Sequence, residues 1–405
     1  MSQTIVIAGA SVAGAQAAAT LRSEGFAGRI VLAGAEPEPP YERPPLSKGF
    51  LQGSVSEDEF ALHETGWYAE QAIDMRLGTR ATSLDITDRT ITLDSGETFA
   101  YDQLLIATGA TPRRLAAPGG DLPGVHYLRT LADARLIRER LAAAQRVVVV
   151  GMGFIGAEIA AVARQAGKDV VALEAGELPM LAALGKEAAS RMAWVHRQHG
   201  VDLRLDDGVI AFEGSGRVER VVTASESTIE SDLVIVGIGV TPATGWLDGS
   251  GVTIERGVLV DEFCRTNIPD IYAAGDVARS WHPAYGEHLL VEHFDNAGNQ
   301  GALAAKNMLG ANEPYAPLPY FWSDQYDLSL QFAGHNAGHD QVVTRGAVES
   351  GSWSAFYLRE GRFVAALSVN RFKDFSAARR LLRAGKEVSA EQLADEAVEL
   401  KGLLR

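Results

Sequence analysis

The chain has 405 residues, enough for two or three domains, and 46% of them are hydrophobic. Its formal net charge of −15 argues against nucleic acid or an anionic membrane as the main partner, and no apolar run reaches the length of a membrane span. The single cysteine, Cys264, excludes an intrachain disulfide and any CxxC redox pair. We expect a cytoplasmic protein without a signal peptide and without a metal site.

The first predicted element is a buried strand over residues 4–9 (TIVIAG), followed by the glycine turn GASVAG and a helix over residues 15–24. Ser11 stands where a dinucleotide-binding turn has its middle glycine, and its Cβ narrows the approach of a pyrophosphate. After the next strand the nearest acid for a ribose is Glu36, because the preceding position is Ala35. This unit is either a nucleotide site or a strand–helix turn without a ligand.

Residues 41–48 (YERPPLSK) are rich in proline, and we expect a rigid extended segment that is not a helix. Lys48 at its end is either a site residue or a solvated surface charge. A hairpin is predicted near Ile86 and residues 90–93, and a strand over residues 101–109 ends in a turn of small residues.

A second and more complete glycine turn follows a linker. Four β-branched residues run into GMGFIG, a helix is predicted over residues 157–166, and the next strand stops at Glu174. Gly151 permits the tight turn, Gly153 lets the backbone approach a pyrophosphate, and Gly156 lets the helix pack on the strand. The helix N-terminus supplies free N–H groups for phosphates. This pattern predicts a dinucleotide site.

The two units, residues 4–36 and 147–174, amount to an internal duplication, which implies two nucleotides or one cofactor and one nucleotide substrate. A further buried strand over residues 232–240 ends in Gly237-Ile238-Gly239.

The third informative stretch is residues 266–278, where a short strand delivers Gly275 and Asp276 to a turn that we expect to begin a helix. Asp276 either binds a sugar or polyol hydroxyl or caps that helix. From Pro319 onward, strand-like runs at residues 328–332, 341–346, 355–358 and 364–369 precede a basic helix over residues 376–386, which indicates a separate α+β domain.

Taken together, these motifs resemble the FAD- and NAD(P)H-dependent reductases of the glutathione-reductase structural class. Within it the chain is most similar to NADH:ferredoxin reductases of the putidaredoxin-reductase and biphenyl-dioxygenase-reductase type. The resemblance covers nearly the whole chain and is carried by GASVAG, YERPPLSK, LLIATGA, GMGFIGAE, IVGIGVTP, IYAAGDVA, VEHFDNAGNQ and FWSDQYDLSLQFAG, in the family's order.

The resemblance implies an α/β protein with two Rossmann-like dinucleotide-binding domains, for FAD and NAD, and a C-terminal α+β domain. We expect a discontinuous FAD domain over 1–112 and 241–317, an NAD domain over 113–240 and a C-terminal domain over 318–405.

The resemblance also implies site residues. Those expected to hold FAD are Gly9, Ser11, Ala13, Gly14, Ala35, Glu36, Arg43, Lys48, Ala81, Thr108, Gly109, Arg129, Gly275, Asp276, Phe294 and Trp322. Those expected to hold NAD are Gly151, Gly153, Phe154, Ile155, Gly156, Glu158, Glu174, Gly237, Ile238 and Gly239. Lys48, Glu158 and Trp322 are expected in the catalytic machinery, with Lys48 and Glu158 as an ion pair.

The expected function is transfer of electrons from NADH through FAD to a small [2Fe–2S] ferredoxin that supplies a mono- or dioxygenase. Cys264 is expected to be a buried structural thiol, so that electrons leave to an external acceptor. Two alternatives stay open: a protein like the apoptosis-inducing factor, whose redox state controls partner binding, and a rubredoxin reductase. Phe294 departs from the tryptophan that relatives often carry.

An acidic ferredoxin is expected to dock on a local run of cations, which could also be only a solvated helix face. These cations are Arg371, Lys373, Arg379, Arg380, Arg383 and Lys386.

Overall fold

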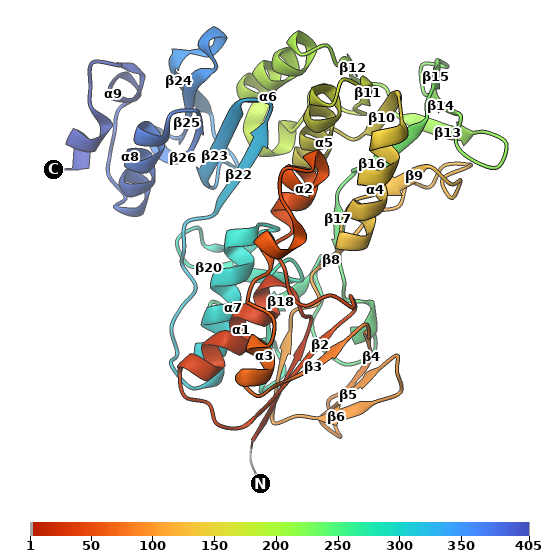
Figure 1. The fold of residues 1–405 in the computed structure, drawn as a ribbon. Coiled ribbons are helices and arrows are strands. Elements are labelled where there is room, and N and C mark those ends of the chain that lie inside the picture. The colour runs from red at the N-terminus through yellow and green to blue at the C-terminus, as the bar shows by residue number, and fades with distance from the viewer. Residues whose placement is uncertain (1–2, 405) are drawn as a thin grey trace. The chain divides into compact units, whose positions relative to one another are not determined.

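The computed structural model describes residues 3–404, which divide into two compact units (Figure 1). Unit 1 comprises the chain up to residue 44 together with residues 56–111 and 240–317. Unit 2 comprises residues 45–55 and 112–239 and the chain from residue 318 onward. The chain therefore passes back and forth between the units.

Unit 1 is built on a parallel sheet of five strands in the order β19-β7-β1-β2-β3. The strands are β1 (Thr4–Ala8), β2 (Arg29–Gly34), β3 (Ile73–Leu77), β7 (Gln103–Ile106) and β19 (Ile271–Ala273). The first three residues of the run Ile5–Ala8 are fully buried, as expected for a strand covered on both faces. Helices α1 (Val12–Ser23) and α7 (Phe294–Met308) pack together, because a Cβ at Gly301 of α7 would lie 2.2 Å from the carbonyl oxygen of Ala13.

Smaller elements complete unit 1. They are η2 (Glu57–Phe60), α3 (Trp67–Glu70), β4 (Ala81–Asp85), β5 (Thr90–Leu93), β6 (Thr98–Ala100), β8 (Ala110–Pro112), β17 (Val240–Pro242), η3 (Gly245–Leu247), β18 (Val258–Val260), β20 (Ala278–His282) and β21 (Glu287–Leu290). The predicted hairpin exists as β4 paired with β5. The predicted helix after Asp276 was wrong, because residues 278–282 form β20, which pairs with β18 and β21. Alternate side chains of β20 are buried, a strand pattern that the sequence reading missed.

Unit 2 contains a second parallel sheet of five strands, in the order β12-β11-β10-β16-β9. The strands are β9 (Val125–Tyr127), β10 (Arg146–Val150), β11 (Asp169–Leu173), β12 (Asp202–Arg204) and β16 (Leu233–Val236). The helices are α4 (Leu131–Ala143), α5 (Phe154–Gln165) and α6 (Leu181–Gln198). An antiparallel meander consists of β13 (Val209–Glu213), β14 (Arg220–Thr223) and β15 (Thr228–Glu230).

The C-terminal part of unit 2 is an antiparallel sheet in the order β22-β23-β26-β25-β24. Its elements are β22 (Tyr320–Gln325), β23 (Leu328–Gly334), β24 (Gln341–Ala347), η4 (Val348–Ser350), β25 (Ser352–Arg359), β26 (Arg362–Val369), α8 (Phe372–Arg383), α9 (Ala390–Ala394) and η5 (Leu400–Leu404). The four strands predicted here are confirmed. The basic helix begins at Phe372, four residues before the predicted start.

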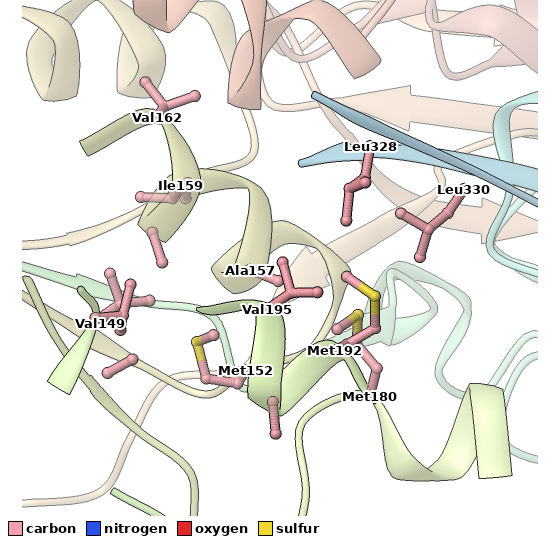
Figure 2. Close-up of a cluster of buried hydrophobic side chains, with 14 of the residues drawn as sticks. Val149, Met152, Ala157, Ile159, Val162, Met180, Met192, Val195, Leu328 and Leu330 are labelled. Carbon is pink, nitrogen blue, oxygen red and sulfur yellow. The ribbon is translucent and has the colours of Figure 1, made fainter. Parts of the chain in front are cut away.

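One hydrophobic core joins the parallel sheet of unit 2 to the C-terminal sheet. In Figure 2, Ile159 and Val162 of α5 and Met192 of α6 gather with Leu328 and Leu330 of β23. Because these side chains are buried at 8% exposure or less, the C-terminal sheet and the helices of the parallel sheet form one packed body within unit 2.

The proline-rich segment is not extended as predicted. Pro44–Ser47 forms the short 3₁₀ helix η1, and Gly49–Gln52 continues as α2. Consecutive prolines suit a first helical turn, because their φ is already fixed near the helical value and that turn needs no N–H donor. Leu51 then packs into the core of unit 2, and the ring of Phe50 lies 4.8 Å from the guanidinium carbon of Arg138 in α4. Within residues 3–404, no helix has the length and hydrophobicity that a membrane span requires.

Candidate functional site

In both parallel sheets the glycine turn follows the central strand. β1 lies between β2 and β7, and β10 lies between β11 and β16, so the chain leaves each central strand in one direction and later returns on its other side. Such a topological switch point is where open α/β sheets bind ligands, beyond the carboxyl ends of the strands.

The glycines at the two switch points are required by close backbone contacts. A Cβ at Gly9 would lie 1.9 Å from the carbonyl oxygen of Ala107, and one at Gly151 would lie 2.5 Å from that of Gly237. The φ angles of Gly9 and Gly151 are +126° and +87°, which other residues rarely adopt. Gly156 plays the packing role, because its Cβ would lie 1.9 Å from the Gly151 oxygen.

The helices that follow both turns present N-termini suited to an anion. Neither α1 nor α5 has an acidic residue in its first turn, and their N-cap residues, Ser11 and Gly153, make no side-chain capping bond. A Cβ at Gly153 would meet no atom within 4 Å, so open space lies in front of α5. Both helix starts therefore fit the phosphates of a dinucleotide.

The acids beyond the two turns are held differently. Glu36 forms an ion pair with Arg43, with Oε1 and Nη2 2.5 Å apart, and accepts a hydrogen bond from the hydroxyl of Tyr41. Glu174 instead accepts backbone bonds from the N–H groups of Met152 at 2.8 Å and Gly176 at 2.9 Å. The Glu174 carboxylate thus lies against its own glycine turn, whereas Glu36 is held by two side chains of the segment that follows it.

Other predicted FAD residues of unit 1 lie at the ends of its strands and helices. Gly275 follows β19, and its N–H donates to Oε1 of Gln300 in α7 at 2.9 Å. Burial alone would lower the pKa of Arg43, but Tyr41, Glu36 and Asp276 outweigh it and raise that pKa. Thr108 and Gly109 follow β7, Ala81 begins β4, and Phe294 begins α7.

Lys48 and Glu158 form the predicted ion pair within unit 2. The distance from Lys48 Nζ to Glu158 Oε2 is 2.8 Å, and the carboxylate side chain is only 2% exposed. Two serines also donate to this carboxylate: Ser47 Oγ to Oε2 at 2.5 Å and Ser323 Oγ to Oε1 at 2.6 Å. A buried charge of this kind is stable only when it is paired and hydrogen-bonded, as it is here.

Trp322 does not join this ion pair directly. In β22 the side chains of Phe321, Ser323 and Gln325 are buried together, so Trp322 lies on the other face of the strand. Its ring stacks on that of Tyr320, with centroids 6.1 Å apart.

The remaining residues predicted for NAD lie close to the second turn. Phe154 and Ile155 open α5, and the Ile155 side chain is 45% exposed at the helix start. Gly237, Ile238 and Gly239 follow β16. The carbonyl oxygen of Gly237 lies against Gly151. Arg129, predicted for FAD, immediately precedes the N-cap of α4 in unit 2.

Cys264 is fully buried, and burial raises the pKa of its thiol to about 12. A protonated thiol without solvent access is a poor nucleophile, which agrees with the structural role predicted for it.

The predicted cation run is divided in the structure. Arg371 pairs with Asp374 at 2.6 Å and Glu396 at 2.7 Å, and the guanidinium carbon of Arg379 lies 4.6 Å from the ring centre of Tyr320. The other four side chains are exposed and form no ion pair within residues 3–404: Lys373, Arg380, Arg383 and Lys386.

Sequence reasoning missed the polar residues behind Glu158. Ser323 lies 165 positions further along the chain, and Gln325 and His196 continue the hydrogen bonds away from it. The only sequence signal is the polar run Ser323-Asp324-Gln325 at the end of this strand, which is weak without the fold.

Comparisons with known proteins agree with this geometry. Residues 3–301 match the family model "Pyridine nucleotide-disulphide oxidoreductase", and residues 320–404 match "Reductase C-terminal". The chain is 41% identical to the ferredoxin reductase subunit of the 5,5'-dehydrodivanillate O-demethylase of Sphingobium, over 98% of this chain and 97% of that protein.

Two solved structures are similar over their whole length. The ferredoxin reductase for the CYP199A2 system of Rhodopseudomonas palustris is 37% identical with a TM-score of 0.97, covering 100% of both chains. The reductase in a covalent putidaredoxin reductase–putidaredoxin complex is 33% identical with a TM-score of 0.96, covering 99% of this chain and 98% of that one.

Proposed function

Because this chain belongs to the pyridine nucleotide-disulphide oxidoreductase family, and within it to the ferredoxin reductases, we propose that it transfers electrons from NADH through FAD to a ferredoxin. The acceptor is a small [2Fe–2S] protein that supplies a mono- or dioxygenase. The proposed place of the reaction is the cytoplasm.

One observation carries the proposal: the chain has two topological switch points suited to nucleotides, and its single thiol is buried. Thiol–disulfide exchange needs an accessible thiolate. Cys264 offers none, since it is fully buried with a raised pKa. Electrons that enter from a nicotinamide therefore leave to an acceptor outside the chain.

The residues of unit 1 fit FAD, both its ADP half and its ribitol chain. The start of α1 would hold the pyrophosphate, Glu36 would accept from the ribose, and Asp276 would accept from the ribitol chain. When bound, FAD would supply the step from two-electron hydride chemistry to single-electron transfer.

The residues of unit 2 fit NADH. The start of α5 would bind the pyrophosphate, and Glu174 would accept from the ribose 2′-OH and repel a 2′-phosphate. By the family resemblance, Lys48 would lie near the flavin ring, paired with Glu158. Glu158 would lie by the nicotinamide, and Trp322 beside the isoalloxazine of FAD.

For the ferredoxin we propose a docking surface on α8 and the segment just after it, formed by Lys373, Arg380, Arg383 and Lys386. Phe372, 58% exposed, adds an apolar contact beside these cations. A cationic face of this kind suits an acidic iron–sulfur protein and fast, weak encounters.

The test is turnover of the FAD-loaded protein with NADH and an acidic [2Fe–2S] ferredoxin, followed by the absorbance of the iron–sulfur cluster. We expect ferredoxin reduction to slow as salt rises, because screening acts over roughly 10 Å at 0.1 M. Charge reversal at Arg380 and Arg383 should raise the KM for ferredoxin.

Ferricyanide is the control acceptor, because it needs no docking surface. NADH-to-ferricyanide turnover should change little with salt or with the reversed charges. Fast ferricyanide turnover with no ferredoxin reduction would contradict the proposal and favour a protein whose redox state controls partner binding.

A further inference from the structure

A chain of hydrogen bonds runs from Glu158 through the interior of unit 2. Ser323 Oγ lies 2.6 Å from Glu158 Oε1, and Gln325 Nε2 lies 3.1 Å from Ser323 Oγ. The other end of the same amide, Gln325 Oε1, lies 3.0 Å from His196 Nε2, and His196 Nδ1 lies 2.9 Å from the hydroxyl of Tyr326. Four side chains from β22, α6 and the turn after β22 thus connect to one carboxylate.

The carboxylate sets the direction of the first two bonds. A carboxylate only accepts hydrogen bonds, so the Ser323 hydroxyl must donate its proton to Glu158. The Ser323 oxygen is then left to accept from the amide NH₂ of Gln325. The second hydrogen of that amide points toward Met180, whose sulfur lies 3.6 Å from Nε2.

The direction of the remaining bonds follows. With its NH₂ facing Ser323, Gln325 turns its carbonyl oxygen to His196, and an amide oxygen only accepts. His196 must therefore carry its proton on Nε2. Its bare Nδ1 then accepts from the hydroxyl of Tyr326, so every proton in the chain points toward Glu158.

The surroundings favour this neutral form of the histidine. Ser323, Gln325 and His196 are each 0% exposed, and burial lowers the pKa of His196 to about 4. A protonated imidazole would have no acceptor nitrogen for the Tyr326 hydroxyl. At neutral pH the chain therefore has one hydrogen-bonding arrangement.

The hydrogen-bonded side chains and Lys48 contact different oxygens of the Glu158 carboxylate. Ser323 binds Oε1, whereas Lys48 and Ser47 both bind Oε2. The bond from Ser323 to Oε1 fixes the rotation of the Glu158 carboxylate about its Cγ–Cδ bond. Oε2 is then directed at the segment that carries Lys48, whose long side chain would otherwise sample many rotamers.

We propose that Ser323, Gln325 and His196 are positioning residues, which orient Glu158 and through it hold Lys48 in place for hydride transfer. This inference rests on the role proposed above for Lys48 and Glu158. It assigns no proton transfer to this series of hydrogen bonds and no contact of these three residues with substrate.

The first test reads the histidine itself. In FAD-loaded protein with ¹⁵N-labelled histidine, NMR should show His196 as the Nε2–H tautomer at pH 7 and still neutral at pH 5.5. In Ser323→Ala the link to Glu158 is lost and the Gln325 amide is free to reverse, so signals of the Nδ1–H tautomer should appear. An Nδ1–H tautomer in the unaltered protein would overturn the proposal.

The second test reads the lysine through flavin reduction by NADH in stopped flow. Ser323→Ala should lower the limiting rate constant about tenfold, with the NADH dissociation constant changed less than twofold. Ser354→Ala is the matched control, because Ser354 is also 0% exposed in the same sheet but bonds to Ser368, at 2.8 Å.

If Ser323→Ala and Ser354→Ala give the same rate constant and the same histidine spectrum, the chain does not position Glu158. A failure to reduce ferredoxin, with the NADH half-reaction intact, would instead contradict the proposed function alone. The tautomer shift in Ser323→Ala would then still support the positioning chain.

Discussion

The two glycine turns occupy the same point in two similar sheets, yet their middle positions differ. The first turn has Ser11 there, and the second has Gly153. The outer glycines of both turns meet backbone oxygens that a Cβ would strike, whereas a Cβ at Gly153 would meet nothing within 4 Å. The fold therefore requires glycine at the outer positions of both turns. At the middle position, packing requires glycine in neither turn.

This difference explains why Ser11 is tolerated. Ser11 has extended backbone angles, which any residue adopts, and its side chain makes no capping bond to α1. The two acids show a parallel contrast, because Glu36 is held by side chains and Glu174 by backbone N–H groups. The second turn keeps its acid in place by its own backbone, while the first depends on Tyr41 and Arg43.

The strongest way to test this comparison is to fill the packing positions. Gly14→Ala and Gly156→Ala would each place a Cβ less than 2 Å from a backbone oxygen, at 1.8 Å and 1.9 Å. We expect each to lower the free energy of unfolding by about 3 kcal/mol or more in urea titrations. A change below about 1 kcal/mol in both would show that the helices can move away from the strands.

A second prediction concerns the pH dependence of stability that buried His196 in α6 should cause. The pKa of buried His196 is about 4 when folded and about 6.5 when unfolded, so below pH 6.5 the unfolded state binds the extra proton. The free energy of unfolding should therefore decrease as the pH is lowered from about 6.5 to about 4. We expect His196 to account for a decrease of about 2 kcal/mol between pH 7 and pH 5. Urea titrations at both pH values check it, and His196→Asn should show a smaller difference than the unaltered protein.

Third, Gly153→Ser would make the second turn like the first. We expect the free energy of unfolding to change by less than about 0.5 kcal/mol, because the added side chain enters open space. The KM for NADH should rise about tenfold, equivalent to about 1.4 kcal/mol, while FAD content stays constant. An unchanged KM would mean that the nucleotide does not approach this position.

The smallest effect is expected from the reverse change, Ser11→Gly. Loss of a Cβ without a capping bond should cost the folded state about 0.5 kcal/mol through the more flexible unfolded chain. FAD should bind no more weakly, as measured by the fluorescence of released flavin against dilution. Weaker FAD binding would show that the Ser11 hydroxyl itself contacts the cofactor.

Much of the fold was predictable, because local rules act strongly in the parallel sheets. β1 was predicted to the residue up to Ala8, and the strand–turn–helix order of both units is confirmed. The errors fall where tertiary pairing decides. Residues 278–282 are a strand only because β18 and β21 lie beside them, and Pro44–Ser47 turns helical as the chain enters unit 2.

The site was predictable only in part. The Lys48–Glu158 ion pair is confirmed, whereas the cofactor roles of the other residues stay predictions. The surroundings of Glu158 could not be read from the sequence, because Ser47, Ser323 and His196 come from distant segments that only the packed core of unit 2 brings together. Likewise, nothing local shows that Arg371 is tied to Asp374 and Glu396.

The interleaved path of the chain has a consequence for synthesis. Unit 1 has its edge strand β19 only when residues 271–273 have been made, and unit 2 borrows residues 45–55 from the N-terminal stretch and gains its second sheet after residue 318. Neither unit can therefore finish folding on the ribosome while the other waits its turn, as domains of a linear array do. The early strands of both units therefore lack some of their final partners until segments that are made late in synthesis are available.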